Sequence, residues 1–460
     1  MNDPAQLEHL SGGPDAPTQL LYFTTPSVTA DGRTLVVVRD EDGNPNLWAI
    51  DLTGSGGSRR LTDQREGILK SYVYFRGRPN RGFGKASVTL DPVRGRVYWI
   101  QGTEIRWIAL AGGEPLEAGP SVPQGAGSGN CLAKLPEDQV TAFMHVSADG
   151  RRLCVPTTDA RALEEDAPAA PRFGENTVAG KRNEVITDKP AHDIDARVQR
   201  EGLSSWLRVF DTATGELIAC ERVPRGWVTH VQFSPVRSDW ILYNHEWPAD
   251  CGVRRLWLWD GQTHRPLRTE SVAGSNVGSA LGPTSRTKPD QDSLSDSSHR
   301  PNPPTAGPGR SRSDWVCHEM WEADGRGIIY HGKFADGVAF IGRVSPAGGD
   351  NVEIALPREY TRYGHFTAGT RHVDWLVSDG YWHPAGESEN GLWGGEWLTR
   401  LQVDWARGRI EWTPLCRHHS AWDCQDSHPH PVFGPGDREI YFTSNRGGGR
   451  SVCRVAVPDS

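Results

Sequence analysis

The chain has 460 residues, and these include 18 tryptophans, 52 glycines and 33 prolines. Many tryptophans among many turn-forming residues favour short strands joined by tight loops over a helical bundle. The formal net charge of −8 argues against a protein that binds nucleic acid, because phosphate contacts need a basic face.

The eight cysteines are irregularly spaced and form no Cys-x-x-Cys pair, so we expect reduced thiols rather than a disulfide framework. Residues 1–14 are polar and contain no apolar signal-peptide core. No apolar run approaches the length of a transmembrane helix. We therefore expect a soluble, cytoplasmic protein with no membrane partner.

The first clear unit in chain order covers residues 20–53. Its β-rich runs, such as Thr34–Val38 and Leu47–Asp51, are separated by Asp-Gly turns, which is a hairpin signal. Six further units repeat this pattern with variations, at residues 86–110, 145–211, 230–260, 321–344, 372–401 and 431–456.

Each unit has the pattern of a four-stranded antiparallel sheet, and such internal repetition is typical of a β-propeller. The sequence therefore predicts an all-β protein, a seven-bladed β-propeller. Neighbouring blades bury each other's faces, so a single domain over residues 15–460 is expected. A pair of β-sandwiches is the alternative, and seven similar units do not fit it well.

Two insertions interrupt the repeats. Residues 159–200 carry many charges and few large apolar side chains, and could form a lid. Residues 271–313 are rich in serine, glycine, proline and aspartate. We expect the second insertion to be disordered, because it has too little apolar surface to offset its chain entropy.

The stretch Gln425–His430 places one amide and two imidazoles within six residues. In an extended segment His428 and His430 share a face, and a turn after Gln425 can bring its amide oxygen to the same point. Imidazole and oxygen ligands suit Mn²⁺, Fe²⁺, Co²⁺, Ni²⁺ or Zn²⁺. A polar blade rim without a metal is the simpler reading of the same residues.

Equivalent positions of different blades converge on the central channel of a propeller, so His318 can join this donor set. His245 stands out within His245-Glu-Trp-Pro248, near Arg255. His230 can instead support its blade through a backbone hydrogen bond. Several other histidines have loop or exposed contexts and are expected to be uninvolved: His9, His264, His299 and His331.

These motifs together resemble the oligogalacturonate lyases, a family of cytoplasmic seven-bladed propeller enzymes of pectin breakdown. The matching motifs are Gln425-x-x-His428-x-His430 with Pro431 and Phe433, His318-x-x-Trp321, His245-Glu-x-Pro-x-Asp250 with Arg255-x-Trp257, His365-Phe, and Ser378-Asp-Gly380. The family tends to have glycine at the position of Trp247, and a tryptophan there could narrow the substrate site.

The resemblance implies a role for each of several residues. The expected ligands of an Mn²⁺-type ion are His318, Gln425, His428 and His430. The expected base is His245, and an arginine of the fourth-blade region, Arg222, Arg225 or Arg255, is expected to neutralise the substrate carboxylate. His230, Trp247 and His365 are expected to contact the substrate.

The implied reaction is β-elimination from short galacturonate oligomers, which yields a 4,5-unsaturated uronate. A cation and an arginine spread the charge of the enediolate, and a neutral histidine is a suitable base near pH 7. Two alternatives stay open at this point. One is a non-catalytic propeller that binds a protein or peptide, and the other is a lyase or epimerase that acts on a different uronate.

Overall fold

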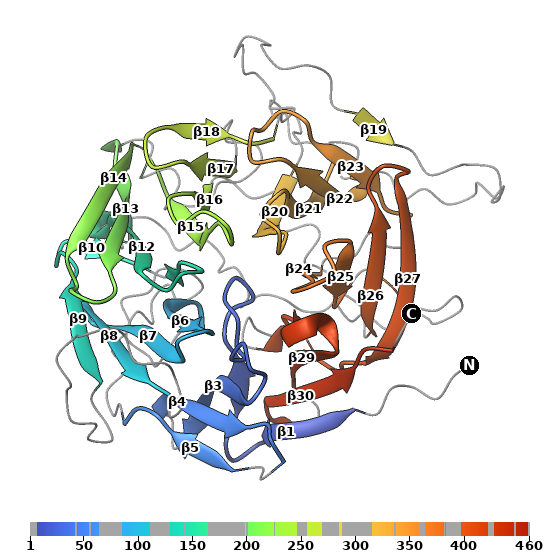
Figure 1. Cartoon of the computed structure of the whole chain (residues 1–460), viewed down its shortest axis with the longest axis horizontal. Coiled ribbons are helices and arrows are strands. Elements are labelled where there is room, and N and C mark those ends of the chain that lie inside the picture. Colours follow the sequence, from blue (N-terminus) through green and yellow to red (C-terminus); the bar gives the residue numbers. More distant parts are fainter. Residues whose placement is uncertain are drawn as a thin grey trace.

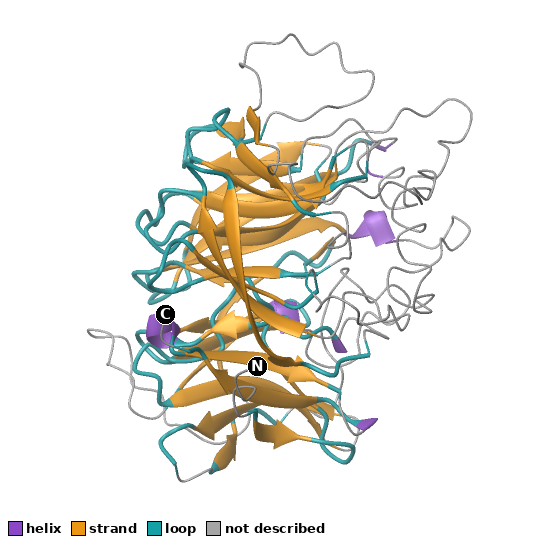
Figure 2. Cartoon of the chain, turned by 90° about the vertical axis from the view of Figure 1, so that its right-hand side faces the viewer, coloured by secondary structure: helices purple, strands orange, loops and turns teal. Residues whose placement is uncertain are grey.

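The computed structural model is a ring of seven β-sheets around a central axis (Figure 1), so the predicted seven-bladed propeller is confirmed. It describes residues 7–41, 44–54, 57–63, 85–110, 129–141, 143–163, 198, 201–224, 226–245, 255–268, 285–287, 315–334, 337–357, 364–380, 382, 397–421, 427–445 and 448–458. Strands dominate the side view of the ring (Figure 2).

The strands run outward from the channel in each blade. Blades 1 and 2 consist of β2 (Thr18–Leu20), β3 (Thr34–Glu41), β4 (Asn44–Asp51) and β5 (Ser58–Arg60), and of β6 (Val88–Asp91), β7 (Arg96–Gln101), β8 (Glu104–Ala109) and β9 (Asn130–Lys134). Blade 3 consists of β10 (Gln139–Val140), β11 (His145–Val146), β12 (Arg152–Asp159), β13 (Ser204–Asp211) and β14 (Leu217–Pro224), and blade 4 of β15 (Val228–Phe233), β16 (Ile241–His245), β17 (Leu256–Trp259) and β18 (His264–Pro266).

Blade 5 contains β20 (Trp315–Trp321), β21 (Ile328–Lys333), β22 (Ala339–Val344) and β23 (Val352–Ala355), and blade 6 contains β24 (Phe366–Ala368), β25 (Trp375–Ser378), β26 (Trp397–Asp404) and β27 (Arg409–Arg417). Blade 7 contains β28 (Val432–Phe433), β29 (Glu439–Ser444) and β30 (Ser451–Ala456). In the described part of the chain, short 3₁₀ helices at Lys85–Ser87, Ala160–Leu163 and Pro435–Asp437 lie between strands.

The N-terminal strand closes the ring. β1 (Glu8–Gly12) pairs antiparallel with β30 and is the outermost strand of blade 7. It lies before residue 15, where the sequence interpretation began the domain. The polar segment EHLSG has no apolar alternation, so its strand character comes from the edge of β30 and not from its own pattern.

The apolar core lies between neighbouring blades. One cluster joins Val36 of blade 1, Trp99 of blade 2 and Leu153 of blade 3, and similar clusters join blades 4 to 7 in pairs. Burial of a large side chain contributes roughly 2–3 kcal/mol each. The ring is therefore held by blade-to-blade packing, without any need for a bound ion.

The two expected insertions lie largely outside the described residues. In the second one, β19 (Ser285–Thr287) pairs in parallel with β23 on the outer side of blade 5. Among the described residues, no helix is long and apolar enough to cross a membrane.

Candidate metal centre

The innermost strands of blades 4 and 5 bulge at equivalent places. The pairing of β15 with β16 shifts at residues 229–232, and that of β20 with β21 shifts at residues 317–320. His230 and His318 lie within these bulges, with φ values of 49° and 52°. A bulge takes a residue out of the ladder and redirects its side chain. The two imidazole centroids lie 6.0 Å apart across the blade boundary.

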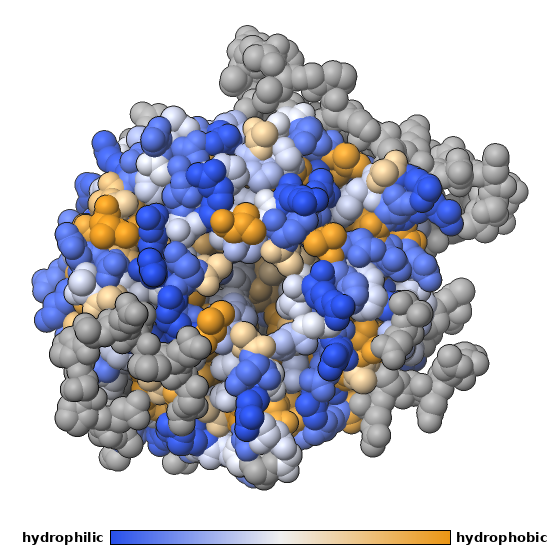
Figure 3. Space-filling view, in the orientation of Figure 1, coloured by the Kyte–Doolittle hydropathy of each residue, from blue (hydrophilic) through white to orange (hydrophobic). Residues whose placement is uncertain are grey.

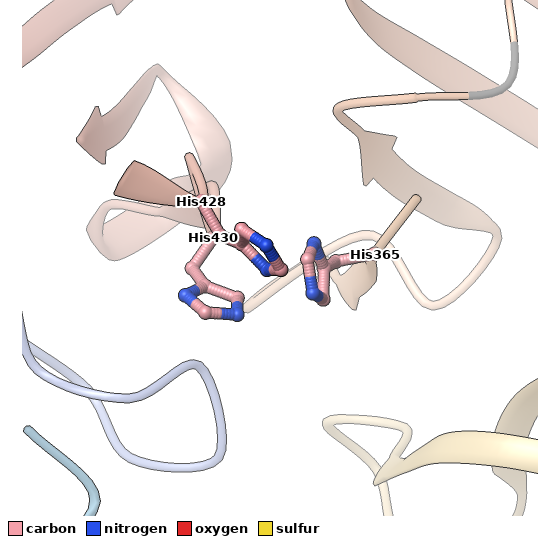
Figure 4. Close-up of side chains that lie close together, drawn as sticks. All are labelled: His365, His428 and His430. Carbon is pink, nitrogen blue, oxygen red and sulfur yellow. The ribbon is translucent and has the colours of Figure 1, made fainter. Parts of the chain in front are cut away.

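Blades 6 and 7 contribute a compact cluster of three buried histidines (Figure 4). His365 directly precedes β24, while His428 and His430 precede β28. One nitrogen of each imidazole lies within 4.8 Å of one nitrogen of the other two. The surface view shows a hollow at the centre of the ring, between the blades (Figure 3).

The segment that holds His428 and His430 is not a strand, although the sequence interpretation placed them on one face of an extended segment. β28 begins at Val432, and His430 has a φ of 43°. The backbone N–H of Thr443 on β29 donates to the Pro429 carbonyl over 2.9 Å and fixes this bend. The two imidazoles therefore meet through a local bend, and not through strand alternation.

Asp379 connects the two sides of the histidine cluster. One carboxylate oxygen accepts the backbone N–H of His365 over 2.6 Å, and the other lies 2.9 Å from His365 Nδ1. The second oxygen also accepts the backbone N–H of His430 over 3.2 Å. Since Nδ1–H of His365 donates to this carboxylate, Nε2 carries the lone pair that can bind a metal.

His318 lies beside the cluster and is held by His331. Their Nδ1 and Nε2 atoms are 2.7 Å apart, and the His318 ring centroid is 4.6 Å from that of His365. Burial, followed by the neighbouring histidines, lowers the pKa of His318 well below its ordinary value. A neutral imidazole is the form that binds a metal. The loop or exposed context expected for His331 is wrong, because this residue is fully buried on β21, where its Nε2 faces His318 Nδ1.

The loop after β2 reaches toward the ring axis (Figure 1), and this loop contains Tyr22 and Phe23. The Phe23 ring lies 5.3 Å from that of His318 and 5.7 Å from that of His430, centroid to centroid. The Tyr22 ring lies 5.1 Å from that of His430. These rings form an apolar wall that limits water access to the imidazoles.

His230 belongs to a buried hydrogen-bond network and not to the compact cluster. Its Nδ1 lies 3.1 Å from Glu319 Oε1, and its Nε2 lies 3.1 Å from the Tyr22 hydroxyl. Asn244 Nδ2 donates to Glu319 Oε2 over 3.2 Å. Both ring nitrogens of His230 therefore have close polar neighbours. The expected role of His230 as a substrate contact stays a prediction.

His245 ends β16, the second strand of blade 4. Its ring packs edge-on against those of Tyr243 and Trp257, and both centroid distances are 5.6 Å. The backbone N–H of His245 donates to the backbone carbonyl of Arg255 over 2.9 Å. Burial, then His264 and Arg255, lowers the pKa of His245 to about 3. His245 is thus neutral at pH 7 and close to one of the expected arginines.

Three expected site residues, Arg225, Trp247 and Gln425, lie outside the described residues. Arg222, the other arginine considered, is on β14, the outermost strand of blade 3, and its Nε donates to Ser204 Oγ over 3.0 Å. This outer position does not favour a role for Arg222 in the channel. Arg255 is buried and stays a candidate for neutralising the substrate carboxylate.

The described histidines fit a divalent transition metal. Three buried imidazoles with nitrogens this close supply three neutral donors and leave positions for further ligands. Sequence reasoning did not assign roles to Asp379, Glu319 or Tyr22. The Ser378-Asp-Gly380 motif was the only signal for Asp379, and the position of Glu319 directly after His318 was the only signal for that carboxylate.

The fold and the site define a seven-bladed propeller with a candidate metal centre in its channel. In sequence, the chain is 22% identical over 242 residues to the oligogalacturonide lyase of Pectobacterium atrosepticum, covering 51% of each protein. It is 23% identical over 260 residues to the oligogalacturonate lyase of Dickeya dadantii, covering 55% of each. The chain thus spans about half the length of the curated relatives it matches, and no family model matches it.

In structure, the chain is similar to an oligogalacturonate lyase from Vibrio parahaemolyticus, with a TM-score of 0.65, 18% identity, and coverage of 99% of this chain and 94% of that one. It is similar to an oligogalacturonate lyase in complex with manganese, with a TM-score of 0.64, 18% identity and the same coverage of 99% and 94%. The expected resemblance to oligogalacturonate lyases is confirmed, and at these identities it establishes the shared fold.

Proposed function

We propose that this protein is a metal-dependent lyase that cleaves short galacturonate oligomers by β-elimination. The observation that carries the proposal is the buried histidine cluster in the channel. The fold around this cluster is shared, over nearly the whole chain, with an oligogalacturonate lyase in complex with manganese. The two curated relatives also carry that lyase name.

The ion would be held by His365, His428 and His430, with His318 at the edge of the cluster and Gln425 as the expected amide ligand. A divalent ion bound there, most simply Mn²⁺, stabilises the negative charge that develops on the substrate carboxylate. Asp379 keeps His365 in one tautomer, and Phe23 keeps bulk water from the imidazoles.

His245 is our proposed base. The imidazole is neutral at neutral pH, so its lone pair is free of a proton and can take the C5 proton of the uronate, although a pKa of about 3 makes it a weak base before substrate binds. Arg255, which is buried beside it, would face the carboxylate and offset its charge. Arg225 is the second arginine in this role. His230 and Trp247 are proposed as substrate contacts, whereas His365, which the sequence led us to expect as a substrate contact, is proposed here as a metal ligand.

The proposed substrate is a small acidic oligosaccharide, such as di- or trigalacturonate. The product would be a 4,5-unsaturated uronate, whose conjugated alkene absorbs in the ultraviolet. A cytoplasmic location stays a prediction.

The test is an absorbance assay with saturated di- and trigalacturonate, run with added Mn²⁺ and after chelation. We expect an alkene signal that needs the metal. His245→Asn should retain Mn²⁺ binding and lower kcat by about 10²–10⁴-fold, the range that a general base contributes. His9→Asn, an exposed histidine on β1, is the matched control and should keep full activity.

Other outcomes separate the competing functions. Loss of C5 hydrogen without an alkene would indicate an epimerase, because the proton is then returned to the ring. Metal binding with no change in any galacturonate would point to a different uronate. The absence of both metal binding and turnover would favour a non-catalytic binding propeller.

A further inference from the structure

The innermost strand of blade 1 contains a much larger bulge than those of blades 4 and 5. Its ladder with β3 breaks after Leu20 and resumes at Val28, so the seven residues 21–27 lie opposite Val36 alone. The bulges of β15 and β20 each place only two residues opposite one. We call residues 21–27 the blade 1 bulge. Its extra length allows it to reach toward the ring axis (Figure 1).

The blade 1 bulge places the Phe23 ring among four imidazoles of blades 4 to 7. Each of these histidines lies four residues before the residue whose backbone N–H closes the turn after the innermost strand, and they are His230, His318, His365 and His430. They therefore occupy equivalent positions around the ring. In the same order, their ring centroids lie 5.9, 5.3, 6.1 and 5.7 Å from that of Phe23. A side chain nearly equidistant from four equivalent positions lies close to the axis of the propeller.

Two further aromatic rings pack beside Phe23 on the side of blades 1 to 3. The Tyr22 ring lies 4.6 Å from the Phe23 ring and 5.4 Å from the Phe143 ring, centroid to centroid. The Phe143 ring lies 5.1 Å from that of His230. All three aromatic side chains are at most 2% exposed. We call Tyr22, Phe23 and Phe143 the aromatic plug.

Hydrogen bonds hold the blade 1 bulge in place. The backbone N–H of Leu21 donates to Ser27 Oγ over 3.2 Å, and the N–H of Val36 donates to the Ser27 carbonyl over 2.7 Å. The Tyr22 hydroxyl lies 3.1 Å from His230 Nε2, which connects the bulge to blade 4. The plug is therefore a fixed part of the fold.

The groups assigned to the proposed reaction lie toward one end of the ring. His365 and His428 precede the first residues of β24 and β28. His245 pairs with Val228, the first residue of β15, and its N–H donates to the Arg255 carbonyl. All of these groups thus lie toward the end at which the innermost strands begin.

We propose that the aromatic plug, with Phe23 at its centre, closes the ring axis beside the histidines. A metal ion, water and a substrate would then reach the imidazoles only from the end at which the innermost strands begin. Phe23 is a positioning residue in this account, because it limits the directions of approach and binds neither the ion nor the substrate. This inference deepens the proposed lyase function and rests on it for the nature of the substrate.

The first test measures the release of Mn²⁺ into excess chelator by stopped flow, together with its affinity by isothermal titration. We expect Phe23→Ala to release Mn²⁺ about tenfold faster, because a second route opens, while the dissociation constant changes by less than about threefold. Phe23→Leu keeps the axis filled and should release the ion at nearly the wild-type rate. Phe442→Ala is the matched control, since Phe442 is fully buried in the core between blades 6 and 7.

The second test needs no metal. Mass spectrometry follows the exchange of histidine C2 hydrogens for deuterium from the solvent in the metal-free protein. Exchange at His318, His365 and His430 should be about tenfold faster in Phe23→Ala than in the wild type or in Phe442→Ala. Tyr22→Phe removes only the hydroxyl beside His230 and should accelerate exchange by a smaller factor, which tests the plug even where Phe23→Ala fails to fold.

Each outcome bears on the proposal. Wild-type rates of release and exchange in Phe23→Ala would show that Phe23 does not close the axis. Equal acceleration in Phe442→Ala would assign the effect to a loosened core and would overturn the plug. A wild-type protein that binds no Mn²⁺ would overturn the proposed function, whereas deuterium exchange would still decide the role of Phe23.

Discussion

The two halves of the channel wall are built by the innermost strands and the loops beside them, and the positions there carry different chemistry. In blades 4 to 7 these positions hold one or more histidines per blade, namely His230, His318, His365, His428 and His430. In blades 1 to 3 they hold Phe23, a buried pair of threonine hydroxyls, Thr25 and Thr89, and Phe143. The propeller fold brings all of these positions to the channel. The side chain at each position decides whether it can bind a metal, donate a hydrogen bond or only pack against its neighbours.

We call the channel wall of blades 4 to 7 the histidine half and that of blades 1 to 3 the apolar half. The histidine half depends on more supporting side-chain hydrogen bonds than the apolar half. His365 depends on Asp379, His318 on His331 and His230 on Glu319. Three of these histidines hold positive φ values, which costs of order 1–3 kcal/mol each. The comparison therefore predicts that substitutions in this half change metal affinity, whereas substitutions in the other half change stability and leave that affinity unchanged.

The largest effect is expected for His428→Ala. The loss of one of three clustered imidazoles should weaken Mn²⁺ binding by more than about 100-fold, which exceeds the usual effect of a residue that supports a ligand. The ring should stay folded, because the core lies between blades. Isothermal titration with Mn²⁺ and a thermal melt check both points. His9→Ala, on the outermost strand of the same blade, is the control. Unfolding of the His428→Ala variant, or of the wild-type protein on chelation, would contradict the account.

A smaller effect on the metal is expected for Asp379→Asn. The asparagine amide has one oxygen, so it cannot accept all three hydrogen bonds that the carboxylate accepts, from the backbone N–H and Nδ1–H of His365 and the backbone N–H of His430. Mn²⁺ affinity should therefore fall by about 10–100-fold. Stability should also fall, by about 2 kcal/mol, because hydrogen bonds to a charged acceptor are lost. Asp404→Asn, on the outer part of blade 6, is the matched control. Unchanged affinity in Asp379→Asn would show that the carboxylate does not orient the ligands.

A pH effect is expected from blade 3. Burial lowers the pKa of His145 to about 4, and its Nδ1 accepts the N–H of Phe233 over 3.1 Å. The unfolded chain binds a proton below about pH 6.5 while the folded protein does not, so the free energy of unfolding falls as pH drops from about 6.5 toward 4.

That fall should amount to about 2 kcal/mol from this group between pH 6.5 and 5. In His145→Gln, which keeps an acceptor but cannot take the proton, urea unfolding should show a shallower loss over this range. An equally steep loss in the variant would assign the pH dependence to other groups.

The smallest effect is expected for Thr25→Val in the apolar half. Its hydroxyl lies 2.8 Å from that of Thr89 and accepts the N–H of Leu90 over 3.3 Å. Its removal should cost about 1–2 kcal/mol of stability, the penalty of unsatisfied buried groups. Mn²⁺ affinity should stay unchanged, and a clear loss of affinity would break the distinction between the two halves.

The sequence predicted what repeats along the chain. β-rich runs separated by short turns, several of them Asp-Gly, recur from blade to blade, so the number of blades could be predicted from them. β1 could not be predicted, because EHLSG has no pattern of its own. The His428-x-His430 spacing pointed to the candidate site, but the expected backbone conformation was wrong. A bend at His430 brings the two imidazoles together in place of the expected strand alternation.

Contacts between distant parts of the chain were beyond the sequence. Asp379 is 51 residues from His430, and Tyr22 is 208 residues from His230, so neither partnership leaves a local signal. His331 illustrates the same point, because strand pairing between β20 and β21 is what places it beside His318.

The measurement that tests the central claim most directly is the anomalous scattering of manganese in crystals grown with Mn²⁺. The account predicts one strong peak in the channel, about 2 Å from imidazole nitrogens of at least three of His318, His365, His428 and His430. A channel without a peak at saturating Mn²⁺, or a peak bound only by residues elsewhere on the ring, would contradict it.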